Sequence, residues 1–229
     1  AGPQHYPAGT LYVVATPIGN LTDITLRALH VLGLVDAVAC EDTRHTASLL
    51  QAYGLQRPLL ALHQHNEAGA AQGIVERLQR GERIAYVSDA GTPGISDPGA
   101  RLCAAVQAAG LRCLPLPGAS SVTALISVAG LPATETDAAF EFTGFLPAKG
   151  AARAQAMRRL AQQDQAGVLL EAPHRIEALA RDLAGLGERH VTVGRELTKQ
   201  FEQVVTLRCD ALPAWLAADA AHARGEFAL

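Results

Sequence analysis

The sequence predicts an α/β protein that is divided into two domains. Short apolar runs alternate along the chain with longer segments whose apolar residues recur at helical spacing, and in the first part of the chain this alternation is typical of a mostly parallel sheet. A stretch rich in turn residues, 130–137, interrupts this alternation. Because 229 residues are enough for two small domains, we expect an N-terminal α/β domain at 10–129 and a C-terminal α/β domain at 138–229.

Strands and helices are expected to alternate regularly in the first domain. Thr22, Asn66 and Asp97 are placed to cap the starts of helices, and Gly54 and Gly81 are placed to end them. Each strand is followed by a helical pattern, the last of them at 120–128. The runs that predict strands lie at 10–15, 36–40, 59–62, 84–87 and 113–116.

The second domain is expected to contain shorter strands and three helices. Helices are predicted at 149–163, from Pro173 onward and at 212–221. The final residues, 225–229, look like the beginning of a strand, so we expect a further C-terminal segment in the natural protein. The predicted strands lie at 140–143, 168–170, 191–193 and 203–207.

Composition excludes several classes of protein. Hydrophobic residues make up 49% of the chain and charged residues 18%, which predicts a packed core and not a disordered chain. The net charge of −3 means that any contact with nucleic acid depends on a local basic patch. The four cysteines show no metal-binding or redox spacing, and no apolar run is long enough to span a membrane. These features indicate a cytoplasmic protein with no membrane segment.

The stretch SDAGTPGISDPG, 88–99, is the most informative part of the sequence. It links a predicted strand to a predicted helix, and in open α/β sheets ligands bind at this end of the strands. Gly91, Gly94 and Gly99 allow the backbone to approach a ligand closely or to adopt positive φ. A plain connection between strand and helix is the alternative interpretation. No dinucleotide-binding, Walker or zinc-protease motif is present in the sequence.

This stretch resembles the signature of bacterial 16S ribosomal RNA (cytidine 2′-O)-methyltransferases, which belong to the tetrapyrrole methylase superfamily. Further segments resemble that family in the same order, so that the resemblance extends from Thr10 to the end of the chain. Within the loop, this sequence has Asp-Ala-Gly where tetrapyrrole-methylating relatives carry Gly-Gly-Asp. The other matching segments are TLYVVATPIGNLTDIT, CEDTRHT, HQHNE, LPGASSVTAL, FTGFLP, EAPHRI and GRELTK.

The resemblance implies the tetrapyrrole methylase type of fold, with S-adenosylmethionine (SAM) bound in a cleft between the two α/β domains. It also implies a homodimer, no metal, and 16S rRNA in the small ribosomal subunit as the substrate. By position in the family motifs, the expected cofactor-binding residues are Pro17, Gly19, Asp89, Ala90, Gly91, Thr92, Ile95, Ser120, Ser121 and Ala172.

A ribose 2′-hydroxyl is a poor nucleophile at neutral pH, so we look for a proton acceptor at the ends of strands. His63, His65 and Glu171 are the candidate catalytic residues. The two histidines and Glu67 could also bind zinc, but no second Cys/His cluster complements them. We therefore favour a polar strand end over a metal site.

Basic residues near the predicted strand ends could bind RNA phosphates. The cluster 41–45 is consistent either with a helix cap whose charges are solvated or with contact to an RNA backbone. The candidate RNA-binding residues are Arg44, Lys149, Arg153, Arg175, Arg195 and Lys199.

The sequence thus predicts SAM-dependent 2′-O-methylation of a cytidine in 16S rRNA. Two alternatives stay open at this point. One is a tetrapyrrole C-methyltransferase, which the Asp-Ala-Gly-Thr-Pro loop fits less well. The other is a non-catalytic module that binds SAM or a nucleotide.

Overall fold

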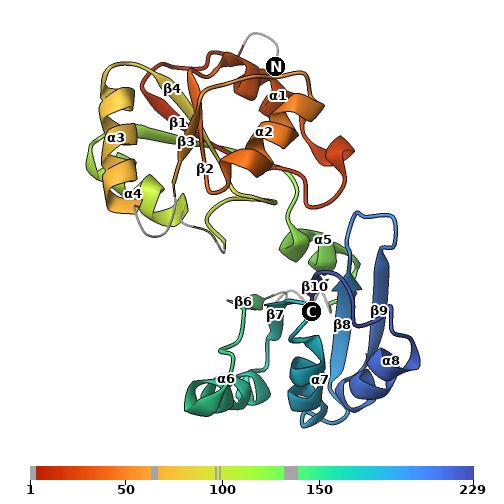
Figure 1. Cartoon of the computed structure of the whole chain (residues 1–229). Helices are drawn as coiled ribbons and strands as arrows, with labels where there is room; N and C mark the ends of the chain where they lie inside the picture. Colours follow the sequence, from red (N-terminus) through yellow and green to blue (C-terminus); the bar gives the residue numbers. More distant parts are fainter. Residues whose placement is uncertain (1–3, 63–66, 96, 98, 132–138) are drawn as a thin grey trace. The chain divides into compact units, whose positions relative to one another are not determined.

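The structure is a computed structural model that describes residues 4–62, 67–95, 97, 99–131 and 139–229. The chain forms two compact units, Ala1–Ser120 and Ser121–Leu229. Figure 1 shows that each unit contains one sheet and its own helices. The predicted α/β architecture with two domains is therefore confirmed.

The division between the units falls before helix α5 (Ser121–Val128), which the sequence analysis assigned to the first domain. Leu125 of α5 packs on Gly194 of the second sheet, where a Cβ atom would lie only 2.9 Å from the leucine Cδ1. This contact explains why α5 groups with the second unit. Most of the predicted boundary, 132–137, lies outside the described residues.

The first unit contains a five-stranded, wholly parallel sheet with the order β3-β2-β4-β1-β5. Strand β1 pairs in register with both β4 and β5, and β2 pairs with both β3 and β4. The strands are β1 (Thr10–Val14), β2 (Ala37–Cys40), β3 (Leu59–Ala61), β4 (Arg83–Val87) and β5 (Arg112–Leu116). The helices are α1 (Leu26–Leu34), α2 (Thr43–Ala52), α3 (Glu67–Gln79) and α4 (Gly99–Ala108), with a 3₁₀ turn at Leu21–Asp23.

Helices cover both faces of this sheet. Val31 of α1 and Leu50 of α2 belong to one buried cluster, and Ile74 of α3 and Leu102 of α4 belong to another on the opposite face. Strand β4 is followed by α4 on the second face, whereas its neighbours β1 and β2 are followed by helices on the first face. At the carboxyl end of β4, neighbouring strands therefore lead into helices on opposite faces of the sheet. This is the place where open α/β sheets form a ligand crevice.

The second unit contains a mixed five-stranded sheet with the order β6-β7-β10-β8-β9. Only β6 and β7 pair in parallel; β10 pairs antiparallel with β7 and β8, and β8 pairs antiparallel with β9. The strands are β6 (Phe140–Gly144), β7 (Ala166–Glu171), β8 (His190–Arg195), β9 (Gln203–Arg208) and β10 (Phe227–Ala228). The helices besides α5 are α6 (Gly150–Gln162), α7 (Ile176–Ala184) and α8 (Leu212–Ala218), with a 3₁₀ turn at Cys209–Ala211.

One face of this sheet packs on helices α6, α7 and α8 (Figure 1). Leu160 of α6, Leu179 of α7 and Leu216 of α8 form one buried cluster with Leu169 and Val193 of the sheet. Strand β10, of which the sequence predicted only the beginning at 225–229, lies in the middle of the sheet. The first sheet is parallel, as the alternation of strands and helices in that part of the sequence predicted, whereas no strand direction was predicted for the second sheet.

Helix starts differ in detail from the prediction. Thr25, not Thr22, caps α1 by accepting a hydrogen bond from the Ala28 N–H. The predicted cap Asn66 lies outside the described residues. No helix in the described part of the chain is long and apolar enough to cross a membrane.

Candidate functional site

The loop that follows β4 is fastened to the ends of the neighbouring strands. Thr16, just after β1, and Gly91 exchange two backbone hydrogen bonds of 3.0 and 3.1 Å. The Thr92 hydroxyl donates to the Ala119 carbonyl, beyond the end of β5, at 3.0 Å. The turns that follow β1, β4 and β5 therefore meet at the point where the helices diverge.

A further contact ties this loop to the end of β2. The backbone N–H of Asp42 donates to Oδ1 of Asp89 at 3.3 Å. Asp42 in turn caps α2, because its Oδ1 accepts hydrogen bonds from the N–H groups of Arg44 at 2.8 Å and His45 at 3.3 Å. These hydrogen bonds hold the pKa of Asp42 below its ordinary value. The cluster 41–45 thus contains the predicted helix cap, and it also leaves the Arg44 side chain 93% exposed.

Two glycines allow these turns to approach one another. Gly91 has φ of +79°, and a Cβ atom there would lie 3.0 Å from Cγ2 of Ile18. A Cβ atom on Gly118 would lie 2.9 Å from the Cβ of Ala15. Side chains at these positions would push the turns apart, so the compact strand-end cluster depends on both glycines.

The predicted cofactor residues of the first unit all belong to these turns. Gly19, Asp89, Ala90 and Ile95 are exposed, Thr92 is half-buried, and Pro17, Gly91 and Ser120 are buried. Exposed backbone and side-chain groups therefore lie on a buried, hydrogen-bonded base. Such an arrangement presents fixed backbone donors and acceptors to a ligand, with little freedom to lose on binding.

Glu171 is the last residue of β7 in the second unit, and its side chain is fully buried. Its Oε1 accepts a hydrogen bond from the Ala172 N–H at 3.0 Å and pairs with Nε of Arg175 at 3.0 Å. Arg175 also donates to the carbonyl oxygen of Leu146. Oε2 of Glu171 is buried and has no hydrogen-bond partner among the described residues. One carboxylate oxygen at this strand end is thus available to accept a hydrogen bond or a proton.

The other candidate acceptors, His63 and His65, lie outside the described residues. Within the described part of the chain, no group of three or more His, Cys, Asp or Glu side chains could hold a metal ion. The alternative of a zinc site at 63–67 is therefore neither supported nor tested by the structure.

Two of the predicted RNA-binding residues, Arg153 and Arg195, are buried in the second unit. Arg153 is 9% exposed, pairs with Asp182 at 2.5 Å and donates to the Pro147 carbonyl at 2.9 Å. Arg195 is 8% exposed and donates to Gln203 and to two backbone carbonyl oxygens. Both guanidinium groups tie elements of the second unit together and do not face the solvent.

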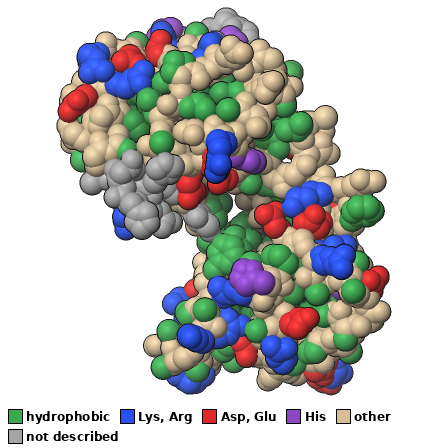
Figure 2. Space-filling model, viewed as in Figure 1, with side chains coloured by type: hydrophobic (Ala, Val, Ile, Leu, Met, Phe, Trp, Pro, Cys, Tyr) green, Lys and Arg blue, Asp and Glu red, His purple; other side chains and the backbone are tan. Residues whose placement is uncertain are grey.

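Two further candidates have partners within the chain. Arg175 contacts Glu171 across the turn that joins β7 to α7. Lys199 pairs with Glu196 at 2.8 Å and with Glu226 at 2.9 Å. Figure 2 shows basic side chains of the second unit interspersed with acidic ones on the visible face. Of the six predicted residues, Arg44 and Lys149 are exposed and the other four are half-buried or buried.

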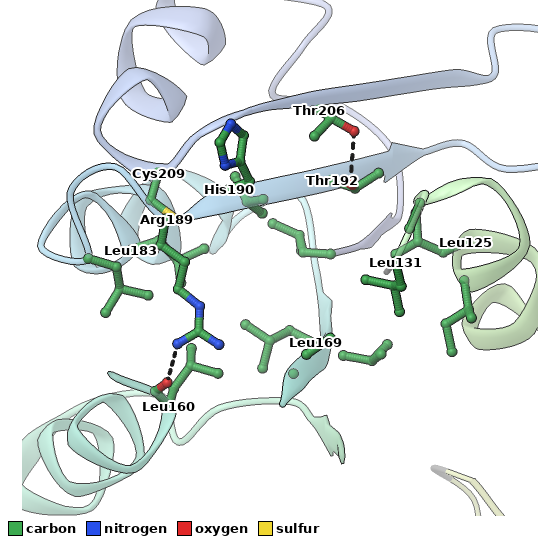
Figure 3. A pocket seen from close by; sticks show the side chains of 18 of the residues that line it. Leu125, Leu131, Leu160, Leu169, Leu183, Arg189, His190, Thr192, Thr206 and Cys209 are labelled. Atoms are coloured by element: carbon green, nitrogen blue, oxygen red, sulfur yellow. Dashed lines mark hydrogen bonds between the residues drawn. The ribbon is translucent and has the colours of Figure 1, made fainter. Parts of the chain in front are cut away.

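A separate, mostly apolar cavity of about 330 Å³ lies within the second unit (Figure 3). Three of its polar side chains have partners: the hydroxyl groups of Thr192 and Thr206 lie 2.8 Å apart, and Arg189 donates to the Leu160 carbonyl at 2.8 Å. None of the described site residues predicted above lines this cavity. This cavity, which His190 and Cys209 also line, is therefore separate from the predicted site.

Comparison with known proteins agrees with this architecture. A family model described as "Tetrapyrrole (Corrin/Porphyrin) Methylases" matches residues 10–213. Two relatives are named "Ribosomal RNA small subunit methyltransferase I": one from Pseudomonas aeruginosa is 48% identical over 96% of this chain and 77% of its own length, and one from Xylella fastidiosa is 48% identical over 96% and 80%.

A solved structure, uroporphyrin-III C-methyltransferase from Thermus thermophilus complexed with S-adenosyl homocysteine, superposes with a TM-score of 0.61. It is 15% identical, and the match covers 96% of this chain and 91% of that one. At this identity the likeness supports the fold alone. The family model and the relatives confirm the resemblance seen in the sequence: the chain belongs to the tetrapyrrole (corrin/porphyrin) methylase family.

Proposed function

We propose that this protein is a SAM-dependent methyltransferase that methylates the ribose 2′-oxygen of a cytidine in 16S rRNA of the small ribosomal subunit. The observation that carries the proposal is the cluster of strand-end turns around Gly91, which lies where the helices leave the sheet in opposite directions. The names of the relatives favour an RNA substrate over a tetrapyrrole. The ribosomal substrate implies a cytoplasmic enzyme.

The residues of the strand-end cluster fit a nucleoside cofactor. SAM needs backbone donors and acceptors, an apolar wall and space close to the backbone. The turn that begins at Thr16 and the loop at 89–92 are joined by hydrogen bonds between Thr16 and Gly91, and Gly91 carries no side chain that could fill the space. When bound, SAM supplies an electrophilic methyl group. The family resemblance extends the predicted contacts to Ser121 and Ala172 in the second unit.

The chain itself has to position the ribose and remove its proton. Glu171 contributes a buried carboxylate whose Oε2 is available, and the Ala172 N–H and Arg175 hold the other oxygen in place. His63 and His65 stay alternative acceptors. A correctly placed acceptor contributes about 10²–10⁴ to the rate of such a step.

Contact with RNA is assigned to the exposed basic residues. Arg44 projects from the first turn of α2, close to the loop that carries Asp89, and Lys149 precedes α6. Arg44 can hold a phosphate with two hydrogen bonds. Homodimerisation remains an expectation from the family resemblance.

The test is incubation of the full chain with methyl-labelled SAM and small subunits that lack the modification. We expect label in 2′-O-methylcytidine after nuclease digestion. Binding of SAM without transfer to any RNA would indicate a non-catalytic module. Methylation of uroporphyrinogen III in a parallel reaction would support the tetrapyrrole alternative and overturn the proposal.

A further inference from the structure

The loop that follows β4 has a second anchor, which lies in the core of the first unit. Tyr86, in β4, is fully buried among residues of α3 and α4. Its hydroxyl group donates a hydrogen bond of 2.8 Å to Oδ1 of Asp97, eleven residues further along the chain. A buried side chain of the sheet thus reaches the far end of the exposed loop.

The carboxylate of Asp97 accepts three hydrogen bonds. In addition to the Tyr86 hydroxyl, Oδ1 accepts from the N–H of Gly99 at 2.8 Å, and Oδ2 accepts from the N–H of Gly94 at 2.7 Å. Gly99 begins α4, whereas Gly94 lies within the loop at φ of +87°. Asp97 therefore does more than the helix capping predicted from the sequence: it closes the second half of the loop onto the strand and the helix.

The packing around Tyr86 leaves this arrangement little freedom. A Cβ atom on Gly99 would lie 2.3 Å from Cε1 of Tyr86, so the first turn of α4 lies directly against the aromatic ring. Burial, together with the nearby Asp97 carboxylate, raises the pKa of the Tyr86 phenol. The phenol therefore stays protonated and donates to Asp97 throughout the physiological pH range.

From these contacts we infer that Tyr86 and Asp97 are positioning residues for the cofactor, acting through the loop at 89–95. The first half of the loop is fixed by Thr16, Ala119 and Asp42, and the second half is fixed through Asp97. A loop that is ordered before binding loses less conformational entropy when it closes on a ligand. This inference rests on the proposed SAM site, and neither residue is expected to touch the reacting atoms.

The test compares Tyr86→Phe with Tyr12→Phe. Tyr12 is a suitable control because it lies in the adjacent strand β1, is 1% exposed, and donates one hydrogen bond of 2.8 Å, to the Pro7 carbonyl near the N-terminus. Both changes keep the aromatic ring and remove one hydroxyl group. We expect Tyr86→Phe to weaken SAM binding about tenfold in calorimetric titration, because the loop must then be ordered on binding. We expect Tyr12→Phe to bind SAM as the unchanged protein does.

Two further measurements separate positioning from general loss of structure. In the methylation assay, Tyr86→Phe should raise the KM for SAM and leave kcat at saturating SAM nearly unchanged. Asp97→Asn, which removes the acceptor for Gly94, should weaken SAM binding similarly. The double variant should be less affected than the product of the two single effects, because both changes act through the same Asp97 side chain.

Each outcome decides the inference. SAM affinity unchanged in Tyr86→Phe, or lowered equally in Tyr12→Phe, would overturn the positioning role and leave the proposed function intact. If the unchanged protein binds no SAM, the proposed function fails and the inference fails with it.

Discussion

The carboxylate of Glu171 lies 3.0 Å from Nε of Arg175, and this pair turns a strand end into a fixed acceptor. The guanidinium and the Ala172 N–H both engage Oε1, which leaves Oε2 buried and without a partner among the described residues. Buried polar atoms normally have partners, and exceptions often mark a ligand or a reaction. The buried, unpartnered Oε2 therefore supports a functional role for Glu171 more strongly than its position at a strand end in the sequence.

Replacing Glu171 by Gln tests that role. The amide keeps the shape and can still accept from the Ala172 N–H, but it cannot take a proton. If Glu171 is the acceptor, methyl transfer should fall at least about a hundredfold in the labelled-subunit assay, whereas SAM affinity stays within about threefold. Glu188→Gln is the control, because Glu188 is 83% exposed and pairs with Arg208 elsewhere in the second unit. Near-normal turnover by Glu171→Gln would exclude it as the base and leave the two histidines.

Much of the fold was predictable from local patterns in the sequence. Strands β1, β2 and β4 of the first unit are buried on both faces, so each is an apolar run in the sequence, and β4 shows this clearly. The cluster of turns around Gly91 was also predictable, because the glycines and the strand end lie within one stretch of sequence.

The burial of Arg153 and Arg195 and the identity of their partners were not predictable from local patterns. Arg153 and Arg195 look like surface charges in the sequence, yet each finds its partners 6 to 29 residues away along the chain. The central position of β10 likewise depends on pairing with β7 and β8. A local pattern carries no information on such long-range partners.

Gly91→Ala and Gly94→Ala form a matched pair of variants. Both glycines have positive φ, +79° and +87°, so alanine at either position costs about 1–2 kcal/mol of backbone strain. Only at Gly91 would the new methyl group meet other atoms, at 3.0 Å from Ile18 and 3.5 Å from the Ala119 oxygen. We expect Gly91→Ala to lower both the melting temperature and SAM affinity more than Gly94→Ala does. Equal effects of the two variants would show that strain, and not the contact between turns, is what matters at Gly91.

We expect the raised pKa of the Cys113 thiol to lower the stability of the protein at alkaline pH. Burial, reinforced by the neighbouring Cys103 thiol, raises the pKa of Cys113 to about 12 from the ordinary value of 9.0. Between these values the unfolded chain releases a proton that the folded chain retains, so ionisation stabilises the unfolded state as the pH rises. The free energy of unfolding should therefore fall between about pH 9 and pH 12, and Cys113→Ala should make this fall less steep. Urea unfolding at a series of pH values measures it, and parallel curves for both proteins would contradict the prediction.

Arg44 is the described residue best placed to test the contact with RNA. Its side chain is 93% exposed at the start of α2, on the carboxyl edge of the first sheet. Each phosphate contact contributes about 0.9 to the slope of log binding constant against log salt on a duplex and about 0.7 on a single strand. Arg44→Ala should therefore reduce the salt slope of small-subunit binding by nearly one and leave SAM affinity unchanged.

Arg112→Ala is the control, since Arg112 is also exposed but begins β5, at the opposite edge of the same sheet. If Arg112→Ala changes the slope as much as Arg44→Ala does, RNA binding reflects overall charge and not a contact at the carboxyl edge.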